Sequence, residues 1–148
     1  MVLNKMKRAS IKRSIQKLTT NRVLENHNSK IEKVVCLVDI DVFGTVQELD
    51  KFAESLGVKS KDFKVIGYSA QKKTIKTYSG LLFTSTKIGW KGVVKDSEIK
   101  DIIEQPTDLL INYYNKDVLG LALLSAKSPA KFKVGLGNVN PQLNDLII

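Results

Sequence analysis

The alternation of apolar and polar positions is clearest between residues 108 and 138, where it predicts a strand, a helix and a second strand. Residues 109–114, LLINYY, form a near-continuous apolar run, which is typical of a strand covered on both faces. We expect Asp117 to cap a short helix whose apolar residues between 118 and 125 share one face. A Ser-Pro pair ends that helix, and residues 131–135 alternate as a second strand.

A similar unit occupies the first half of the chain. Residues 31–38 end in an apolar run that predicts a buried central strand, and residues 63–68 predict another. Between them, Thr45 and Glu48 have the spacing of a capping box at the start of a helix. The apolar face of this helix consists of Val46, Leu49, Phe52, Ala53 and Leu56. Two strands joined by a helix through short connections predict a right-handed parallel unit.

The middle of the chain, residues 69–94, has a weaker pattern. Polar and apolar side chains alternate over residues 72–78, which is compatible with a surface strand or an ordered loop. The apolar run 81–83 and Trp90 are large, so we expect them to be buried. Asp96 then caps a short helix with three isoleucines on one face, and the last five residues predict a short strand.

These elements predict the α/β fold class. We expect a single three-layer, Rossmann-like domain with a mostly parallel sheet of about five strands. Residues 1–28 are expected to form a basic amphipathic helix, and residues 29–148 the single α/β domain. A chain of 148 residues with 43% hydrophobic side chains is long enough to bury one such core.

The expected location follows from what the composition excludes. No apolar run approaches the roughly 20 residues of a membrane span, and the N-terminus lacks the apolar core of a secretory signal. The one cysteine, Cys36, lies in the apolar run VVCLV, which predicts a buried thiol in a reducing compartment. We therefore expect a cytoplasmic protein, with attachment to the inner face of the membrane as an alternative.

The net charge of +9 is concentrated at the N-terminus, because residues 1–24 contain seven basic side chains and no acidic one. These candidates for contact with an anionic partner are Lys5, Lys7, Arg8, Lys12, Arg13, Lys17 and Arg22. They flank a narrow apolar stripe, Ile11, Ile15 and Leu18, which no tryptophan or phenylalanine accompanies. Such a segment can dock on the domain or stay a partly disordered arm. It can also bind an anionic membrane surface, nucleic acid or another acidic partner.

Three runs of residues, DLLINYY, SAKSPAKFKVGLGN and the terminal NDLII, together resemble a family of small bacterial proteins catalogued only as a domain of unknown function. The resemblance covers most of the chain and is clearest over residues 107–148. It implies no activity.

A second resemblance concerns residues 108–136, which are similar in layout to the N-terminal half of heptosyltransferase-like glycosyltransferases. In that layout a strand that opens on Asp leads through a helix rich in Ala and Leu to a basic strand that ends in Gly. Two features depart from those enzymes. They tend to show Gly-Asp where this chain has Gly44-Thr45, and their sugar-nucleotide site lies largely in a second domain, for which this chain has no room.

Asp39 and Asp41 follow a predicted strand, at the edge where an open α/β sheet binds its ligands. The run DIDVFGT resembles the D-x-D-x-T loop of haloacid dehalogenase-like phosphotransferases, although Thr45 comes too late for that spacing. The enzyme hypothesis is therefore phosphoryl or glycosyl transfer centred on these two carboxylates. The alternative is that both are solvated or cap the end of a strand.

The sequence predicts neither a metal site nor a cofactor. One histidine, His27, and one cysteine cannot build a zinc site by themselves, and no P-loop motif is present. Gly135 and Gly137 are followed by Pro141, which excludes the helix of a dinucleotide fingerprint. The leading hypothesis is a non-catalytic interaction role, with a protein or an anionic partner bound through the basic helix or the crevice at the strand ends.

Overall fold

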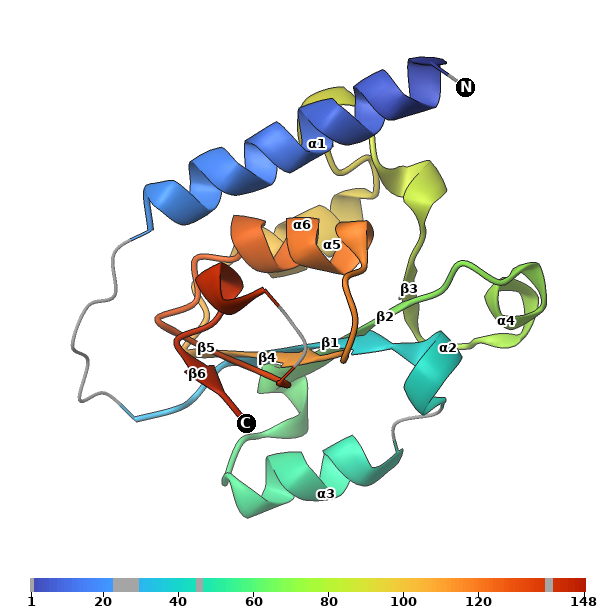
Figure 1. Ribbon diagram of the computed structural model, residues 1–148. Coiled ribbons are helices and arrows are strands. Elements are labelled where there is room, and N and C mark those ends of the chain that lie inside the picture. Colours follow the sequence, from blue (N-terminus) through green and yellow to red (C-terminus); the bar gives the residue numbers. More distant parts are fainter. Residues whose placement is uncertain (1, 23–29, 45–46, 138–139) are drawn as a thin grey trace.

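The strands form one sheet in the computed structural model, which describes residues 2–22, 30–44, 47–137 and 140–148 (Figure 1). All six strands are parallel, in the order β3-β2-β1-β4-β5-β6. They are β1 (Val34–Asp39), β2 (Phe63–Tyr68), β3 (Leu81–Phe83), β4 (Leu109–Tyr113), β5 (Phe132–Gly135) and β6 (Leu146–Ile147). The predicted α/β class and parallel sheet are confirmed. The strand beyond the expected five is β3, from the middle region with the weak pattern.

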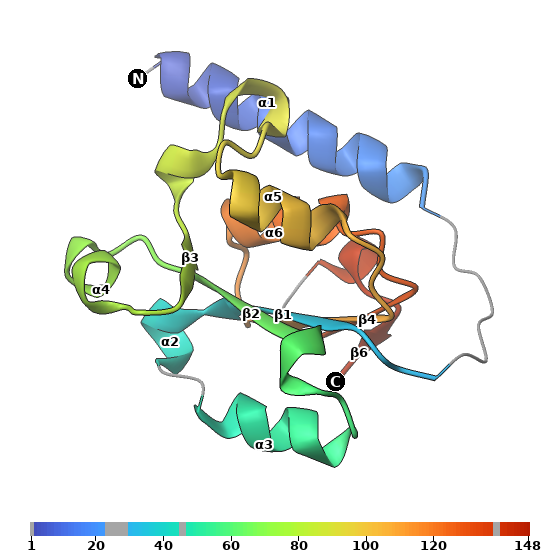
Figure 2. The ribbon, with the colours of Figure 1, turned by 180° about the vertical axis from the view of Figure 1, so that it is seen from behind.

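Helices cover both sides of the sheet (Figures 1 and 2). The α-helices are α1 (Val2–Thr20), α2 (Ile40–Phe43), α3 (Gln47–Ser55), α4 (Lys72–Thr77), α5 (Ser97–Glu104) and α6 (Leu119–Lys127). The 3₁₀ turns are η1 (Ser60–Asp62), η2 (Ser85–Lys87), η3 (Trp90–Gly92) and η4 (Pro141–Leu143). Helix α3 lies on one side and α5 and α6 on the other, with α1 outside α6 as a further layer. None of the described helices has both the length and the apolar character that crossing a bilayer requires.

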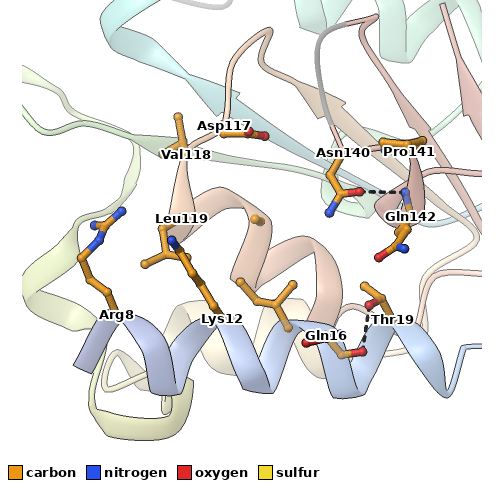
Figure 3. A pocket seen from close by; sticks show the side chains of 12 residues that line it. Arg8, Lys12, Gln16, Thr19, Asp117, Val118, Leu119, Asn140, Pro141 and Gln142 are labelled. Atoms are coloured by element: carbon orange, nitrogen blue, oxygen red, sulfur yellow. Dashed lines mark hydrogen bonds between the residues drawn. The ribbon is translucent and has the colours of Figure 1, made fainter. Parts of the chain in front are cut away.

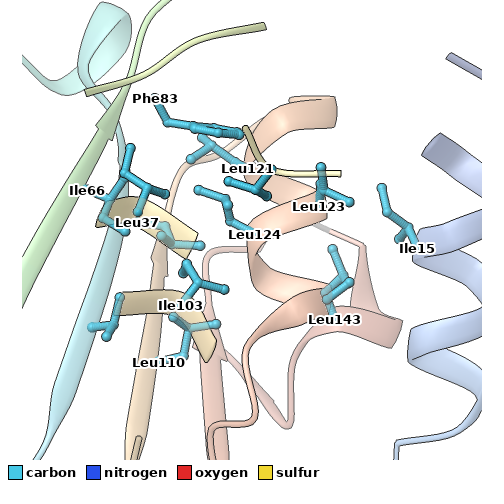
Figure 4. Close-up of a cluster of buried hydrophobic side chains, with 14 of the residues drawn as sticks. Ile15, Leu37, Ile66, Phe83, Ile103, Leu110, Leu121, Leu123, Leu124 and Leu143 are labelled. Atoms are coloured by element: carbon cyan, nitrogen blue, oxygen red, sulfur yellow. The ribbon is translucent and has the colours of Figure 1, made fainter. Parts of the chain in front are cut away.

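Helix α6 is apolar on nearly all sides because it is covered twice. Leu121 and Leu124 are fully buried and point toward the sheet, whereas Leu123 points toward Ile15 of α1 (Figure 4). Ile11 and Ile15 are buried in the same cluster, so the apolar stripe of α1 docks on the domain. Leu18, the third residue of the stripe, remains 38% exposed.

The opposite side of the sheet has a smaller apolar core. Val34, Cys36 and Val38 alternate with the residues that face α6 and pack against Leu49 and Ala53 of α3. Cys36 is buried as predicted, and burial raises the pKa of its thiol.

A buried polar network lies under α6 instead. Lys133 of β5 is 1% exposed and donates a hydrogen bond of 2.5 Å from Nζ to the carbonyl of Ser125. Burial, with a contribution from nearby Arg22, lowers the pKa of Lys133 to about 8. Asn112 of β4 donates to the Ser125 hydroxyl at 2.9 Å and to the Asn144 side chain at 2.8 Å. The network therefore ties α6 to the sheet and to the segment after η4.

Four local predictions are wrong. Residues 72–77 form a helix, which has no buried residue to reveal a helical period. Trp90 is 46% exposed, and Phe52 is 43% exposed on the outer part of α3. The cap of α6 is Val118 rather than Asp117, and it provides no side-chain hydrogen bond.

The predicted helix cap at Asp96 is confirmed, because its carboxylate accepts a hydrogen bond of 3.1 Å from the Ile99 N–H. Thr45 and Val46 lie outside the described residues.

Candidate anion-binding cleft

Asp39 lies at the carboxyl end of β1, next to the point where the strand order changes direction between β1 and β4. Its side chain is the N-cap of α2 and accepts a hydrogen bond of 3.2 Å from the Asp41 N–H. Asp39 is 2% exposed, and its Oδ2 has no hydrogen-bond partner among the described residues. The structure thus uses this carboxylate to turn the chain out of the sheet.

Asp41 joins the loop after β1 to the loop after β2. One carboxylate oxygen accepts a hydrogen bond of 2.6 Å from the Ser69 hydroxyl, and the other accepts one of 2.9 Å from the Ala70 N–H. Among the described residues, no three His, Cys, Asp or Glu side chains are grouped as metal ligands would be. Neither aspartate lines the two clefts described below. His27 lies outside the described residues.

The basic side chains of the N-terminal segment point in different directions. Arg8 and Lys12 line the larger cleft, and Arg8 and Lys7 line the smaller one. Lys5, Arg13 and Lys17 are exposed and line neither of these clefts. Arg22 follows the end of α1 and forms a two-point ion pair with Asp145, so its charge is already matched within the protein.

The larger cleft lies between α1, the start of α6 and η4, and has a volume of about 690 Å³ (Figure 3). Arg8 and Lys12 extend from α1 toward Val118 and Leu119. Gln16, Thr19, Asn140 and Gln142 add amide and hydroxyl groups, and Asp117 contributes a carboxylate. The apolar part of the lining consists of Ile15, Val118, Leu119, Ala122 and Pro141.

The start of α6 adds positive character to this cleft. A helix leaves its first N–H groups without intrahelical partners, and an N-cap side chain usually accepts from one of them. Val118 cannot do so, and both Val118 and Leu119 line the cleft. Because the helix dipole also favours negative charge at this end, an anion here would be attracted by α6 and by the two cations of α1.

A smaller cleft of about 370 Å³ shares Arg8 and Leu119 with the larger one. Its other polar groups include Lys7, Ser85, Thr86 and Tyr68. The Tyr68 ring packs so closely on Gly120 that a β-carbon there would lie 2.5 Å from it, so glycine is required. Burial raises the pKa of Tyr68. The positive charge of Arg8 acts against this rise, and the negative charges of Asp39 and Asp41 add to it.

The sequence identified the cations of this site but not the groups that face them. Val118, Leu119, Asn140 and Gln142 belong to ordinary helix and turn patterns that carry no functional signal. They meet α1 only because it crosses over α6, which lies about a hundred residues later in the chain. An unusual feature of residues 119–126 could have indicated this contact, since a helix apolar all round needs a second cover.

A family model matches residues 7–148, and the chain therefore belongs to that family, the family of unknown function DUF6913. This confirms the resemblance to a family without an assigned activity. No curated protein and no solved structure matches the chain, and the heptosyltransferase resemblance stays a prediction.

Proposed function

We propose that this member of the DUF6913 family is a non-catalytic cytoplasmic protein that binds a small anionic ligand in the cleft between α1 and α6. The observation that carries the proposal is the position of Arg8 and Lys12 across the cleft from the uncapped start of α6. Neither cation has an ion-pair partner among the described residues.

The chemistry of the lining favours a ligand with a phosphate or carboxylate group attached to a partly apolar body. Arginine presents a planar set of donors that matches the oxygens of such groups. The amides of Asn140 and Gln142 and the hydroxyl of Thr19 can hydrogen-bond to polar parts of the ligand. A volume of about 690 Å³ is within the usual range of small-molecule sites.

The proposal is tested by titration calorimetry with inorganic phosphate, nucleotides, sugar phosphates and dicarboxylates. The test variant is Arg8→Gln with Lys12→Gln. The matched control is Arg13→Gln with Lys17→Gln, which removes the same charge from α1 at positions that do not line the cleft. A hydrogen bond to a charged group contributes about 1.5–3 kcal/mol, so the cleft variant should bind at least about a hundredfold more weakly.

Equal weakening by both variants would mean that the ligand responds only to the overall charge of α1, and the cleft would not be its site. If none of these compounds binds to the unmodified protein at millimolar concentration, the small-ligand proposal fails. A protein partner bound through α1 would then be the better hypothesis.

A further inference from the structure

Helix α1 and the turn η3 form one continuous part of the surface. The Ser14 hydroxyl donates a hydrogen bond of 2.5 Å to the Lys91 carbonyl, and the Lys91 N–H donates one of 3.1 Å to the Ser10 hydroxyl. Gly92 packs onto α6 so closely that a β-carbon would lie 2.7 Å from Leu123. The turn is therefore held against both helices, and Figure 2 shows this loop lying against α1.

This α1–η3 surface is strongly basic. Residues 2–22 and 85–95 together contain ten basic side chains and no acidic one. Besides the seven of the N-terminal segment they are Lys87, Lys91 and Lys95. Two of the ten are already paired, Arg22 with Asp145 and Lys87 with Asp96. Lys5, Arg13, Lys17, Lys91 and Lys95 are exposed.

Large apolar side chains are exposed on the same two segments. Met6 of α1 is 56% exposed, Trp90 of η3 is 46% exposed, and Val93 next to it is 54% exposed. Tryptophan beside cations is typical of surfaces that rest at the boundary between lipid head groups and acyl chains. The sequence alone did not show this combination, because Trp90 lies about 70 residues after α1.

We infer that the α1–η3 surface docks on an anionic lipid bilayer, with Trp90, Met6 and Val93 at the acyl boundary and the surrounding cations among the head groups. Cations alone would equally suit nucleic acid. The exposed Met6 and Val93 side chains favour lipid, because neither can pair with a phosphate or stack on a base as an aromatic ring does. The inference does not depend on the cleft, since the exposed Arg13, Lys17 and Lys91 do not line it.

Trp90 is the single tryptophan of the chain, so its fluorescence reports directly on this surface. The full-length protein is titrated with vesicles of phosphatidylcholine alone and with vesicles that also contain phosphatidylglycerol. We expect a blue shift with the anionic vesicles only, and quenching of Trp90 when their acyl chains carry bromine. Binding detected by sedimentation without quenching would show that Trp90 does not enter the bilayer and would overturn the inference.

The test variant is Arg13→Glu with Lys17→Glu and Lys91→Glu. The control is Lys51→Glu with Lys59→Glu and Lys61→Glu, three exposed lysines from the α3 side of the molecule. Each cation near an anionic membrane contributes about fivefold to binding, so the loss of three should weaken the binding of the test variant to these vesicles by at least roughly a hundredfold. The control variant should keep most of the affinity.

Two further results would overturn the inference. One is equal loss of vesicle binding in both variants, which would indicate a non-specific charge effect. The other is tight binding of single-stranded RNA that the test variant loses, while the unmodified protein shows no blue shift with any vesicle. Trp90→Ala completes the set, because it should weaken vesicle binding while leaving the melting temperature nearly unchanged.

Discussion

The two sides of the sheet are built differently. On the α3 side, α3 and the short helix α2 cover an apolar cluster around Cys36. On the α6 side, two helical layers cover a larger apolar cluster, and beneath α6 the buried groups Asn112, Ser125 and Lys133 form a hydrogen-bonded network. Both proposed contact surfaces belong to the α6 side, and both include α1.

This difference separates what stabilises the fold from what is available for binding. On the α3 side, the buried residues of α3 pack against the apolar face of β1. On the α6 side, α1 adds cations and contains no acidic residue, whereas Arg22 just after the helix is paired with Asp145. Asn112, Ser125 and Lys133 are joined by hydrogen bonds, so the network under α6 fixes the position of the elements that line the cleft.

The largest effect should come from removing the contact between α1 and α6. Ile11 is 3% exposed in the shared cluster, and Ile11→Ala should lower the free energy of unfolding by about 2–4 kcal/mol. Leu18→Ala, at a position 38% exposed on the same helix, should cost less than about 1 kcal/mol. Urea denaturation measures both. Equal costs would mean that the stripe does not dock through Ile11.

The polar network makes a second distinct prediction, on pH. The pKa of Lys133 is about 8 in the folded protein and 10.5 for an ordinary lysine. Between these values the unfolded chain binds more protons, so stability rises with pH. From pH 7 to 9.5 the gain should be about 2 kcal/mol.

Lys133→Met should abolish this rise, and Lys131→Met, at an exposed position just before β5, should preserve it. Burial raises the pKa of Tyr68, Tyr78 and Tyr114, so these tyrosines lower the stability as the pH rises and oppose the effect of Lys133. Both proteins contain the same tyrosines, and the difference in stability between unmodified protein and Lys133→Met therefore cancels their contribution. A difference between unmodified protein and Lys133→Met that stays constant with pH would contradict the prediction.

The sequence predicted elements well where one face of each is buried. Five of the strands and helices α3, α5 and α6 follow from apolar periodicity, as does the docking stripe of α1. The sequence-based prediction failed where contacts between distant parts of the chain determine which side chains are buried. Lys133 is buried while its neighbour Phe132 is 38% exposed, because the position of β5 in the sheet rather than hydrophobicity sets which residue points under α6.

The same limit applies to the candidate site. The sequence showed the cations of the N-terminal segment as a run of charge. It did not show which of them line the cleft, which lie on the proposed docking surface and which form an ion pair. Arg22 looks like the other six in the sequence, yet it pairs with Asp145 near the C-terminus. Asp39 and Asp41 were visible as a possible reaction centre, and only the hydrogen bonds to Ser69 and Ala70 show how Asp41 is used.

The third prediction separates these aspartates from the cleft. Asp41→Ala removes both hydrogen bonds between the loops after β1 and β2 and should cost about 1–2 kcal/mol. Asp39→Asn keeps an acceptor for the cap of α2 and should cost less, under about 1 kcal/mol. Neither should change the affinity of a ligand that binds beside Arg8. A loss of ligand binding in both variants, at full stability, would instead support the hypothesis that the two carboxylates form the reaction centre.

The smallest effect is expected on the α3 side, at a position that the sequence placed in the apolar face. Phe52 is 43% exposed, and Phe52→Lys gives up its partial burial but keeps an aliphatic stem over the same surface. The new lysine also follows Glu48 by four residues on α3, an arrangement that stabilises a helix by about 0.2–0.5 kcal/mol. The net change in the free energy of unfolding, measured by urea denaturation, should stay below about 1 kcal/mol.

The control is Leu49→Ala, at a buried position on the same helix, which should lower the free energy of unfolding by about 2–3 kcal/mol. If Phe52→Lys were the more damaging of the two, the outer half of α3 would be covered in solution, and the α3 side would also have a binding partner.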